Sequence, residues 1–489
     1  MNLIHLFDLS LQGRSREPAL EWAPGAIPPV TSTFGEIEAR SNRLARELDQ
    51  RGLHMGDRLC AYLKNRSEFI DLYLACLKLG ITFVPINTLY REREISYIIS
   101  NVDPAALIAE EPITVPCPVW RLADLITAAS LLDSTRLIRD VDGTAPALIM
   151  YTSGTTGRAK GVVLTHNNLA ANTLSLLTLW QISPSDRFLL SLPLFHLHGL
   201  GVGLHCWIAS GCRMRLLERF EQRTTEDTFL SFRPTLFFGV PTMYVRLNQL
   251  AAAAEIGEFM RLFVCGSAPL PVQVLEEFRS RFNHTILERY GMTETLINMS
   301  NPYIGERRPG SVGLPVAGVS VRLLDEKGVP VKEGEVGQVH VRGSNVFAGY
   351  WRNDEATDNA FSDGYFRTGD LAIRSGNGYF DLQGRASDLI ISGGYNIYPR
   401  EIEDFLNEQP EIAEATVVGL EDSLWGQVPV AFVVAASEVD PSEIKLRCKS
   451  SMASFKAPHH IVVVESLPRN ALGKVDKREL INLKPINPA

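Results

Sequence analysis

The chain has 489 residues, of which 45% are hydrophobic and 21% are charged, and its formal net charge is -8. This length exceeds one ordinary hydrophobic core, so the composition predicts a globular protein of at least two domains. The acidic balance argues against nucleic acid as a general partner, and no apolar run is long enough to span a membrane.

Two further properties bear on the compartment. The first residues lack the basic start and the small-residue cleavage site of a secretory signal. The seven cysteines show no CxxC or metal-type spacing, which is typical of buried or incidental thiols in a reducing environment. We therefore expect a cytoplasmic protein.

The first half of the chain alternates strand and helix patterns. Thr33 and Glu36 have the spacing of a capping box and predict an amphipathic helix that runs to Gly52. Further segments are expected as strands at 57–63 and 81–87, a helix at 67–80, and later strands at 147–152, 234–240 and 261–265. This rhythm predicts an α/β fold, with mainly parallel sheets covered by helices.

The pattern changes in the last third. Residues from about 310 to 384 form short alternating runs separated by turns, which predicts a β-rich subdomain. After residue 384 the chain returns to helices and strands, with helices expected at 398–406 and after Asp440. We expect a large N-terminal domain of residues 1–384 and a small mobile α+β domain of residues 385–489.

Residues 151–170 read YTSGTTGRAKGVVLTHNNLA, which combines glycines and hydroxyl side chains with Lys160. Glycines let backbone N–H groups approach a phosphate, hydroxyls donate to its oxygens and lysine adds charge. The spacing differs from that of the usual phosphate loop, and surface turns often use the same residues. Alone, this segment is weak evidence for an anion site.

Four other motifs follow it in order, at 290–294 (YGMTE), 365–372 (YFRTGDLA), 384–403 (GRASDLIISGGYNIYPREIE) and 468–480 (PRNALGKVDKREL). With these the chain resembles the adenylate-forming superfamily of acyl-CoA synthetases, luciferases and adenylation domains over nearly its whole length. The resemblance implies attack of a carboxylate on the α-phosphate of ATP with Mg²⁺, followed by displacement of AMP by coenzyme A. Both steps bring anions together, so catalysis should rest on positioning and charge neutralisation.

The resemblance also implies site residues. Lys474, Thr155 and Glu294 are expected to be catalytic, and Glu294 would also hold Mg²⁺, a cation that prefers carboxylate and phosphate oxygens. Asp370 would accept from the ribose hydroxyls and Arg385 would support ribose or phosphate. The full expected ATP-binding set is Thr152, Ser153, Gly154, Thr155, Thr156, Gly157, Lys160, Gly266, Ser267, Ala268, Tyr290, Gly291, Met292, Thr293, Glu294, Asp370, Arg385 and Lys474. Gly393, Gly394 and Tyr395 are expected to bind coenzyme A.

Each of these residues has a simpler interpretation. Asp370 could make an Asx turn, Arg385 could be a surface charge, and Lys474 could be a solvated lysine beside a glycine turn. The paired glycines 393 and 394 could serve an ordinary turn. The chain also has Ser387 where many relatives carry Lys or Asp at the hinge between domains, although a small residue can absorb a backbone rotation.

The sequence says less about which acid is the substrate than about the type of reaction. Arg246 and Arg289 lie in segments expected to line the acyl pocket, where an unpartnered arginine would be costly to bury. A second carboxylate on the substrate would pair with them, and these segments resemble malonyl-CoA synthetases. We therefore expect malonate, or methylmalonate, with His196 beside the reacting carboxylate.

Several alternatives stay open. Arg246 could lie on an outward helix face and His196 could be a packing residue. The activity could be that of a synthetase for another small or medium acid, of a module that loads a carrier protein, or of a non-catalytic nucleotide-binding relative. The sequence sets no oligomeric state.

Overall fold

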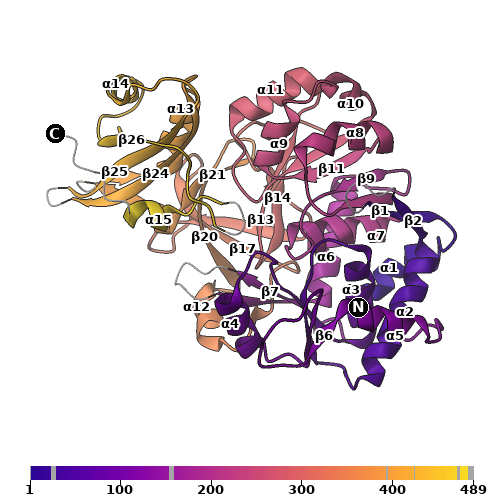
Figure 1. The fold of residues 1–489 in the computed structure, drawn as a ribbon. Helices are drawn as coiled ribbons and strands as arrows, with labels where there is room; N and C mark the ends of the chain where they lie inside the picture. Colours follow the sequence, from indigo (N-terminus) through magenta and orange to yellow (C-terminus); the bar gives the residue numbers. More distant parts are fainter. Residues whose placement is uncertain are drawn as a thin grey trace.

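The structure is a computed structural model that describes residues 2–23, 29–152, 159–392, 395–422, 425–470 and 474–482. Figure 1 shows two helix-covered sheets, a β-rich part beside them and a small domain that carries the C-terminal segment at one end of the molecule. The predicted α/β class with a β-rich subdomain and a C-terminal α+β domain is confirmed.

The first sheet has, within the described ranges, the strand order β18-β8-β7-β4-β3-β5-β6. Its central pairs are parallel, whereas β7 pairs with β8 and β8 with β18 in antiparallel fashion. The strands are β3 (Arg58–Tyr62), β4 (Thr82–Pro85), β5 (Ala106–Ala109), β6 (Val119–Arg121), β7 (Pro146–Thr152), β8 (Lys160–Thr165) and β18 (Gly349–Tyr350). The associated helices are α2 (Phe34–Gln50), α3 (Ser67–Leu79), α4 (Glu92–Val102), α5 (Leu122–Ser130) and α6 (His166–Leu179).

Local sequence signals explain where these helices begin and end. Thr33 and Glu36 form the predicted capping box, since the Glu36 N–H donates to Thr33 Oγ1 and the Thr33 N–H donates to the Glu36 carboxylate. Helix α3 ends at Gly80, which has a φ of 71° and so takes the left-handed conformation that favours glycine. The sequence therefore fixes these ends through backbone chemistry.

The second sheet has the order β15-β14-β13-β12-β11-β9-β10-β1-β2. Its strands are β1 (Pro18–Ala23), β2 (Val30–Thr33), β9 (Arg187–Leu190), β10 (Arg213–Leu217), β11 (Leu236–Gly239), β12 (Leu262–Cys265), β13 (Leu287–Met292), β14 (Leu296–Ser300) and β15 (Leu314–Pro315). The helices are α1 (Leu3–Leu11), α7 (His205–Ser210), α8 (Gln222–Phe232), α9 (Pro241–Leu247), α10 (Ala253–Phe259) and α11 (Val272–Phe282), with a π-helical turn at His198–Leu204. Parallel pairing of β9, β11, β12 and β13 brings the C-terminal ends of these strands to one edge, where ligands bind in such sheets.

The β-rich part is an antiparallel sheet next to these two. It contains β16 (Val319–Leu324), β17 (Val336–Gly343), β19 (Phe361–Ser362), β20 (Tyr365–Arg374) and β21 (Phe380–Arg385), with α12 (Asp354–Ala360) alongside. Strand β21 ends at Arg385 and is followed by a 3-10 turn at Ala386–Asp388, which includes Ser387. The chain then enters the small domain.

The small domain has its own hydrophobic core, which includes Ile390, Ile402, Leu406 and Ile444. Its elements are β22 (Ile390–Ser392), β23 (Tyr395–Ile397), α13 (Pro399–Asn407), β24 (Ile412–Asp422), β25 (Gly426–Ala435), α14 (Pro441–Ser451), β26 (His460–Val464) and α15 (Lys477–Asn482). The expected cap at Asp440 forms, because its carboxylate accepts from the N–H groups of Ser442 and Glu443.

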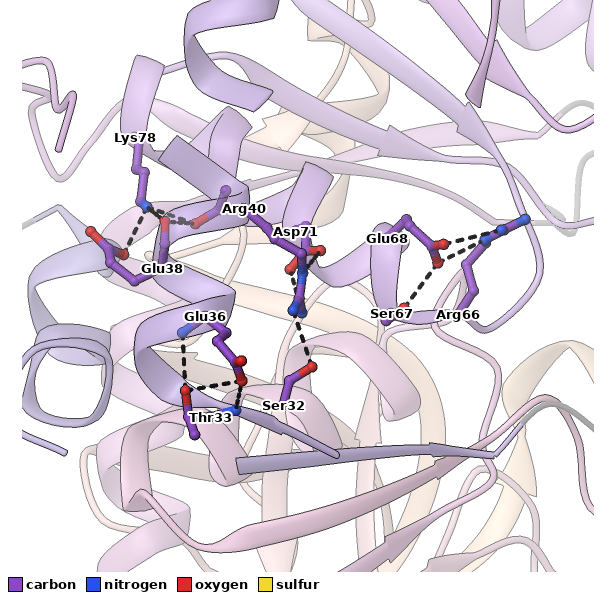
Figure 2. A network of polar contacts seen from close by, with 11 residues as sticks. Ser32, Thr33, Glu36, Glu38, Arg40, Arg66, Ser67, Glu68, Asp71 and Lys78 are labelled. Carbon is purple, nitrogen blue, oxygen red and sulfur yellow. Dashed lines mark hydrogen bonds and ion pairs between the residues drawn. The ribbon is translucent and has the colours of Figure 1, made fainter. Parts of the chain in front are cut away.

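Charged side chains are buried between α2 and α3, in the network that Figure 2 shows. Lys78 is fully buried, and its ammonium lies 2.7 Å from Glu38 Oε2, 2.7 Å from Ser41 Oγ and 2.6 Å from Asn42 Oδ1. Beside this cluster, Arg40 Nε lies 2.6 Å from the buried carboxylate of Asp71. Each buried charge therefore has a partner of opposite sign, as burial requires.

In the part of the chain that the structure describes, no helix is long and apolar enough to cross a membrane. The seven cysteines are free thiols, and all are buried except Cys117, which is partly buried.

Candidate active site

Three of the expected nucleotide-binding residues meet at the end of the β-rich sheet. Asp370 on β20 stands opposite Arg385 on β21, and Arg385 Nε lies 2.7 Å from Asp370 Oδ1. The hydroxyl of Tyr290 on β13 donates to the other carboxylate oxygen, Asp370 Oδ2, over 2.5 Å. Burial raises the pKa of Asp370 while the Arg385 guanidinium opposes that shift. The arrangement is a buried, oriented carboxylate that can accept hydrogen bonds.

A second carboxylate lies on the turn that follows β13. Glu294 is buried, accepts from the Tyr350 hydroxyl over 3.1 Å and has a pKa that burial raises. The ring of Tyr350 also carries the Lys160 ammonium, 4.8 Å from its centroid. Tyr350 on β18, which pairs with β8, therefore contacts both groups: its hydroxyl donates to the Glu294 carboxylate, and its ring face lies under the ammonium of Lys160 at the start of β8.

The phosphate-loop prediction falls mostly outside the described residues. Thr152 and Lys160 are register partners at the ends of β7 and β8, so these strands bracket the segment from both sides. Ser153, Gly154, Thr155, Thr156 and Gly157 lie outside the described residues, and so do Gly393 and Gly394 of the expected coenzyme A segment. Tyr395 is 56% exposed and stacks on Phe455, with ring centroids 4.5 Å apart.

Backbone geometry is specialised at the two glycine positions of the expected adenine site. A side chain on Gly266 would collide with the Arg289 guanidinium, because a Cβ there would lie 2.5 Å from Arg289 Cζ. A Cβ on Gly291 would lie 1.8 Å from the carbonyl oxygen of Leu296. Ser267 takes a φ of 74°, a strained conformation for a residue with a side chain, and Ala268 beside it is exposed. Met292 and Thr293, which lie between Gly291 and Glu294 in the chain, are partly buried.

Lys474 reaches this cluster from the small domain. Its pKa is lowered, first by burial and next by the Arg385 cation, while Asp370 and Glu294 act in the opposite direction. Burial, and after it the charge of the same lysine, lowers the pKa of His196 to about 4. Although part of the Lys474 residue is exposed, its charge is therefore close to the groups of the large domain. The structure thus brings together Lys474, Asp370, Arg385, Glu294 and His196.

The two arginines of the acyl pocket prediction differ. Arg289 is buried, its Nε and one terminal nitrogen make no hydrogen bond, and burial lowers its pKa to about 10. Arg246 is exposed on α9. The exposure of Arg246 thus favours the outward orientation considered in the sequence analysis. Arg289, in contrast, is a buried cation suited to binding an anion.

Sequence reasoning missed His198, which follows His196 by two residues. It is buried, its Nδ1 lies 3.2 Å from Ser267 Oγ, and its Nε2 has no hydrogen-bond partner. Burial and the charge of Arg289 lower its pKa, which keeps the ring neutral. The signal was present, because two histidines stand two residues apart in FHLHG, but nothing in the sequence showed which ring would face Arg289.

The metal prediction rests on one carboxylate. In the described ranges no cluster of three or more His, Cys, Asp or Glu side chains could hold a metal ion alone. Glu294 would hold Mg²⁺ together with the phosphates of ATP, because its buried carboxylate supplies oxygen ligands of the kind that Mg²⁺ prefers. Such a site takes most of its ligands from the nucleotide and water.

Comparison with known proteins identifies the family. The profile of the AMP-binding enzyme family matches residues 7–351, and that of the AMP-binding enzyme C-terminal domain matches residues 401–474. The chain belongs to the AMP-binding enzyme family. The predicted resemblance to adenylate-forming enzymes is confirmed.

The relatives of this enzyme are ligases that are named for several different acids. It is 35% identical over 457 residues to a 2-succinylbenzoate–CoA ligase of Bacillus licheniformis, which covers 92% of this chain and 94% of the relative. It is 34% identical over 506 residues to a mitochondrial malonate–CoA ligase of Mus musculus, with 92% and 86% covered. It is 32% identical over 464 residues to a feruloyl-CoA synthase of a Streptomyces species, with 92% and 93% covered.

A solved structure extends the likeness to the whole fold. The crystal structure of ATP-bound MatB from Rhodopseudomonas palustris matches with a TM-score of 0.92 and 37% identity, and 99% of each chain is covered. With these relatives, this AMP-binding enzyme is an ATP-dependent acyl-CoA ligase. Its ATP and coenzyme A requirements follow from that activity.

Proposed function

We propose that the acid activated by this ligase is malonate or its close analogue methylmalonate. The observation that carries the proposal is Arg289, a buried guanidinium with two nitrogens that lack hydrogen-bond partners. A buried, unpartnered cation costs several kcal/mol, about the scale of breaking a buried ion pair. A second carboxylate on the substrate would supply the missing partner.

The neighbours of Arg289 support a polar end to the acyl pocket. His198 presents a buried Nε2 without a partner, and its ring is close enough to Arg289 for that charge to lower its pKa. A pocket for a fatty or aromatic acid would instead be lined by apolar groups at this depth. The names of two relatives also favour a dicarboxylate substrate, because malonate and 2-succinylbenzoate are both dicarboxylates.

The remaining site residues fit the two-step reaction. We propose that Lys474 neutralises charge between the attacking carboxylate and the α-phosphate; in support, the charges of Asp370 and Glu294 oppose the lowering of its pKa by burial. Asp370 would accept from the ribose hydroxyls. Glu294 would hold Mg²⁺, which neutralises the phosphate charge when it is bound. Lys160 with the loop from Thr152, including Thr155, would hold the outer phosphates.

Coenzyme A would enter for the second step along Tyr395 and the glycines before it. Tyr395 is exposed, so its surface is available to a ligand in this arrangement of the chain. Domains 1–384 and 385–489 would rotate relative to each other about the turn at Ser387, consistent with the end of β21 at Arg385. A cytoplasmic location is part of the same proposal.

A second candidate function is the activation of a monocarboxylic acid, such as an aryl or medium-chain acid. The likeness to a feruloyl-CoA synthase favours it, and so does the exposure of Arg246, which leaves the pocket with one buried arginine. Loading of a carrier protein in place of coenzyme A is a variant of either candidate.

The test is a panel of acids offered to the purified enzyme with ATP and Mg²⁺, with pyrophosphate release and thioester formation measured separately. Malonate or methylmalonate should exceed acetate, propionate and octanoate in kcat/KM by at least about a hundredfold if the ion pair is buried. Equal use of octanoate or ferulate would overturn the dicarboxylate assignment in favour of the second candidate. Transfer to a carrier protein but not to coenzyme A would replace only the acceptor.

A further inference from the structure

Tyr350 lies between two parts of the nucleotide site that come from different segments of the chain. Its hydroxyl donates to Glu294 Oε1 over 3.1 Å, and its ring centroid lies 4.8 Å from the Lys160 ammonium. A cation within about 6 Å of the face of an aromatic ring is attracted to it. One side chain therefore contacts both the carboxylate assigned to Mg²⁺ and the lysine assigned to the outer phosphates.

The backbone on either side of Tyr350 is bonded to the same two segments. The Phe347 N–H donates to the Glu294 carbonyl over 2.8 Å. The Trp351 N–H donates to the Gly161 carbonyl over 2.7 Å. Between these two bonds, β18 pairs with β8 in antiparallel fashion. This short segment therefore connects the turn that follows β13 to the strand that follows the expected phosphate loop.

The orientation of the Tyr350 ring is set by its neighbours. The Tyr350 N–H donates to Thr357 Oγ1 on α12 over 2.9 Å. The buried ring of Phe347 packs edge-on against the tyrosine ring, with centroids 4.8 Å apart. Gly349 has a φ of 147°, and a Cβ there would lie 2.9 Å from Thr357 Cγ2, so the close approach of this strand to α12 requires glycine. These contacts leave the tyrosine little freedom to move.

We propose that Tyr350 is a positioning residue with two functions: its hydroxyl orients Glu294 for Mg²⁺, and its ring holds the Lys160 ammonium for the outer phosphates. The inference rests on the roles of Glu294 and Lys160 in the proposed function. The hydrogen bond engages Oε1 and restricts rotation of the carboxylate, so the second oxygen can serve as a ligand. The aromatic face attracts the ammonium without cancelling its charge, as a carboxylate would, and so leaves that charge for an anion.

The two functions separate in ATP binding, measured by titration calorimetry without acid or coenzyme A so that no turnover occurs. Each variant is titrated in EDTA and in saturating Mg²⁺, and the ratio of the two dissociation constants gives the Mg²⁺ enhancement of ATP binding. Tyr350→Phe removes the hydroxyl and keeps the ring. It should reduce the Mg²⁺ enhancement about tenfold, the lower end of the effect of removing a hydrogen-bond partner from a metal ligand. Its affinity for ATP in EDTA should stay within about twofold of the wild type, since the ring is retained.

Removal of the ring should have a second, distinct effect. Tyr350→Leu and Tyr350→Met should lose the Mg²⁺ enhancement as Tyr350→Phe does. They should also bind ATP about threefold to tenfold more weakly in EDTA, the scale of one cation–π contact. Lys160→Met should lose at least as much affinity in EDTA and keep the Mg²⁺ enhancement.

Two comparisons control for indirect effects. Glu294→Gln combined with Tyr350→Phe should lose no more Mg²⁺ enhancement than Glu294→Gln alone, because both act through one carboxylate. Tyr379 makes the same two kinds of contact outside the residues assigned to ATP: its ring centroid lies 4.0 Å from the Arg308 guanidinium, and its hydroxyl donates to the Glu306 carbonyl over 2.8 Å. Tyr379→Phe should leave both the affinity in EDTA and the Mg²⁺ enhancement unchanged.

The proposal is wrong if Tyr350→Phe keeps the wild-type Mg²⁺ enhancement, or if Tyr350→Leu and Tyr350→Met weaken ATP binding in EDTA no more than Tyr350→Phe does. Loss of the enhancement in Glu294→Gln but not in Tyr350→Phe would refute the role of Tyr350 alone. If Glu294→Gln keeps the enhancement, the magnesium assignment of the proposed function is wrong and the role of the hydroxyl falls with it. The malonate assignment does not enter the comparison, because no acid is present.

Discussion

Asp370 and Arg385 face each other across β20 and β21, with Arg385 Nε 2.7 Å from Asp370 Oδ1. The pair joins the last strand of the large domain to the carboxylate expected at the ribose. One oxygen of Asp370 faces Arg385 and the other accepts from Tyr290, so the carboxylate is fixed from both sides before any ligand arrives. A preorganised acceptor of this kind loses little entropy when it binds.

Asp370→Ala is therefore expected to impair ATP use above all. Loss of a buried acceptor costs about 1–3 kcal/mol, which corresponds to roughly fivefold to 150-fold in the KM or kcat/KM for ATP. Steady-state kinetics with ATP varied at saturating acid and coenzyme A would measure it. The KM for the acid serves as the internal control and should change little. An unchanged KM and kcat for ATP would rule out a ribose contact.

Lys474→Ala should separate the half-reactions. Removal of one aimed donor costs about 10²- to 10³-fold, and the loss is expected in pyrophosphate exchange only. Conversion of a presynthesised acyl-adenylate to the thioester should stay near the wild-type rate. Lys477→Ala offers a nearby lysine for comparison, and should cost less because that side chain binds Glu403 in the small domain. Equal losses in both half-reactions would contradict the assigned role.

The sequence predicted the parts of the fold that local chemistry determines, such as the capping box at Thr33 and Glu36 and the turn at Gly80, from backbone and spacing rules. The motifs around Tyr290 and Asp370 were instead recognised through the resemblance to the adenylate-forming superfamily. The packing of one segment against another could not be predicted this way. Which of two histidines faces Arg289 depends on strands β12 and β13, more than sixty residues further along the chain.

The same limit explains why the burial of the two arginines could not be predicted. Arg246 and Arg289 look alike in sequence, yet Arg246 is exposed on α9 whereas Arg289 is buried against Gly266. Whether a long side chain is exposed or buried depends on how its helix or strand packs against the rest of the fold. The parallel pairing of β1 with β10 is another example, because these strands are nearly two hundred residues apart in the sequence.

The buried cluster around Lys78 predicts a large stability effect. Lys78→Met removes the cation that Glu38, Ser41 and Asn42 share, and should cost about 3–5 kcal/mol, the usual price of breaking a buried ion pair by removing one partner. Arg136 remains 3.1 Å from Glu38 and should keep the loss near the lower end. Urea unfolding would measure it.

A matched lysine controls for the loss of charge. Lys64 pairs with Glu218 at the surface, where both side chains are well exposed, so Lys64→Met should change stability by less than about 1 kcal/mol. If both lysine variants unfold at the same urea concentration as the wild type, the cluster contributes no net stability.

Acid should destabilise the enzyme through His166. This ring is buried, its Nδ1 accepts from the Leu3 N–H over 3.1 Å, and burial lowers its pKa to about 4 from an ordinary value near 6.5. Between these values the unfolded chain binds a proton that the folded chain does not, so stability is lost as the pH falls from 6.5 to 4. The shift corresponds to about 3 kcal/mol.

His166→Gln tests this contribution, because glutamine can accept the Leu3 N–H without titrating. The variant should lose less stability than the wild type between pH 6.5 and pH 4, by about 3 kcal/mol at pH 4. His54→Gln, at an exposed position, should lose as much as the wild type. Parallel stability curves for wild type and His166→Gln over this range would show that the buried imidazole does not carry the effect.

The substrate proposal gives the sharpest prediction for Arg289. Malonate reacts through one carboxylate, so the other remains an anion that must leave water inside the pocket. Pairing with the buried guanidinium offsets that penalty, at about 3–5 kcal/mol or roughly two to three and a half decades in kcat/KM. Arg289→Met should therefore erase most of the preference for malonate over propionate. The change is measured as the ratio of their kcat/KM values.

Two measurements distinguish substrate binding from damage to the neighbouring adenine segment. The KM for ATP in Arg289→Met should stay within about threefold of the wild type, and activation of propionate should be retained or improved, since the unpartnered charge is gone. Arg246→Ala should reduce the malonate preference less, because water screens an exposed arginine. If Arg289→Met keeps the full preference while Arg246→Ala abolishes it, the exposed arginine binds the second carboxylate and the buried one does not.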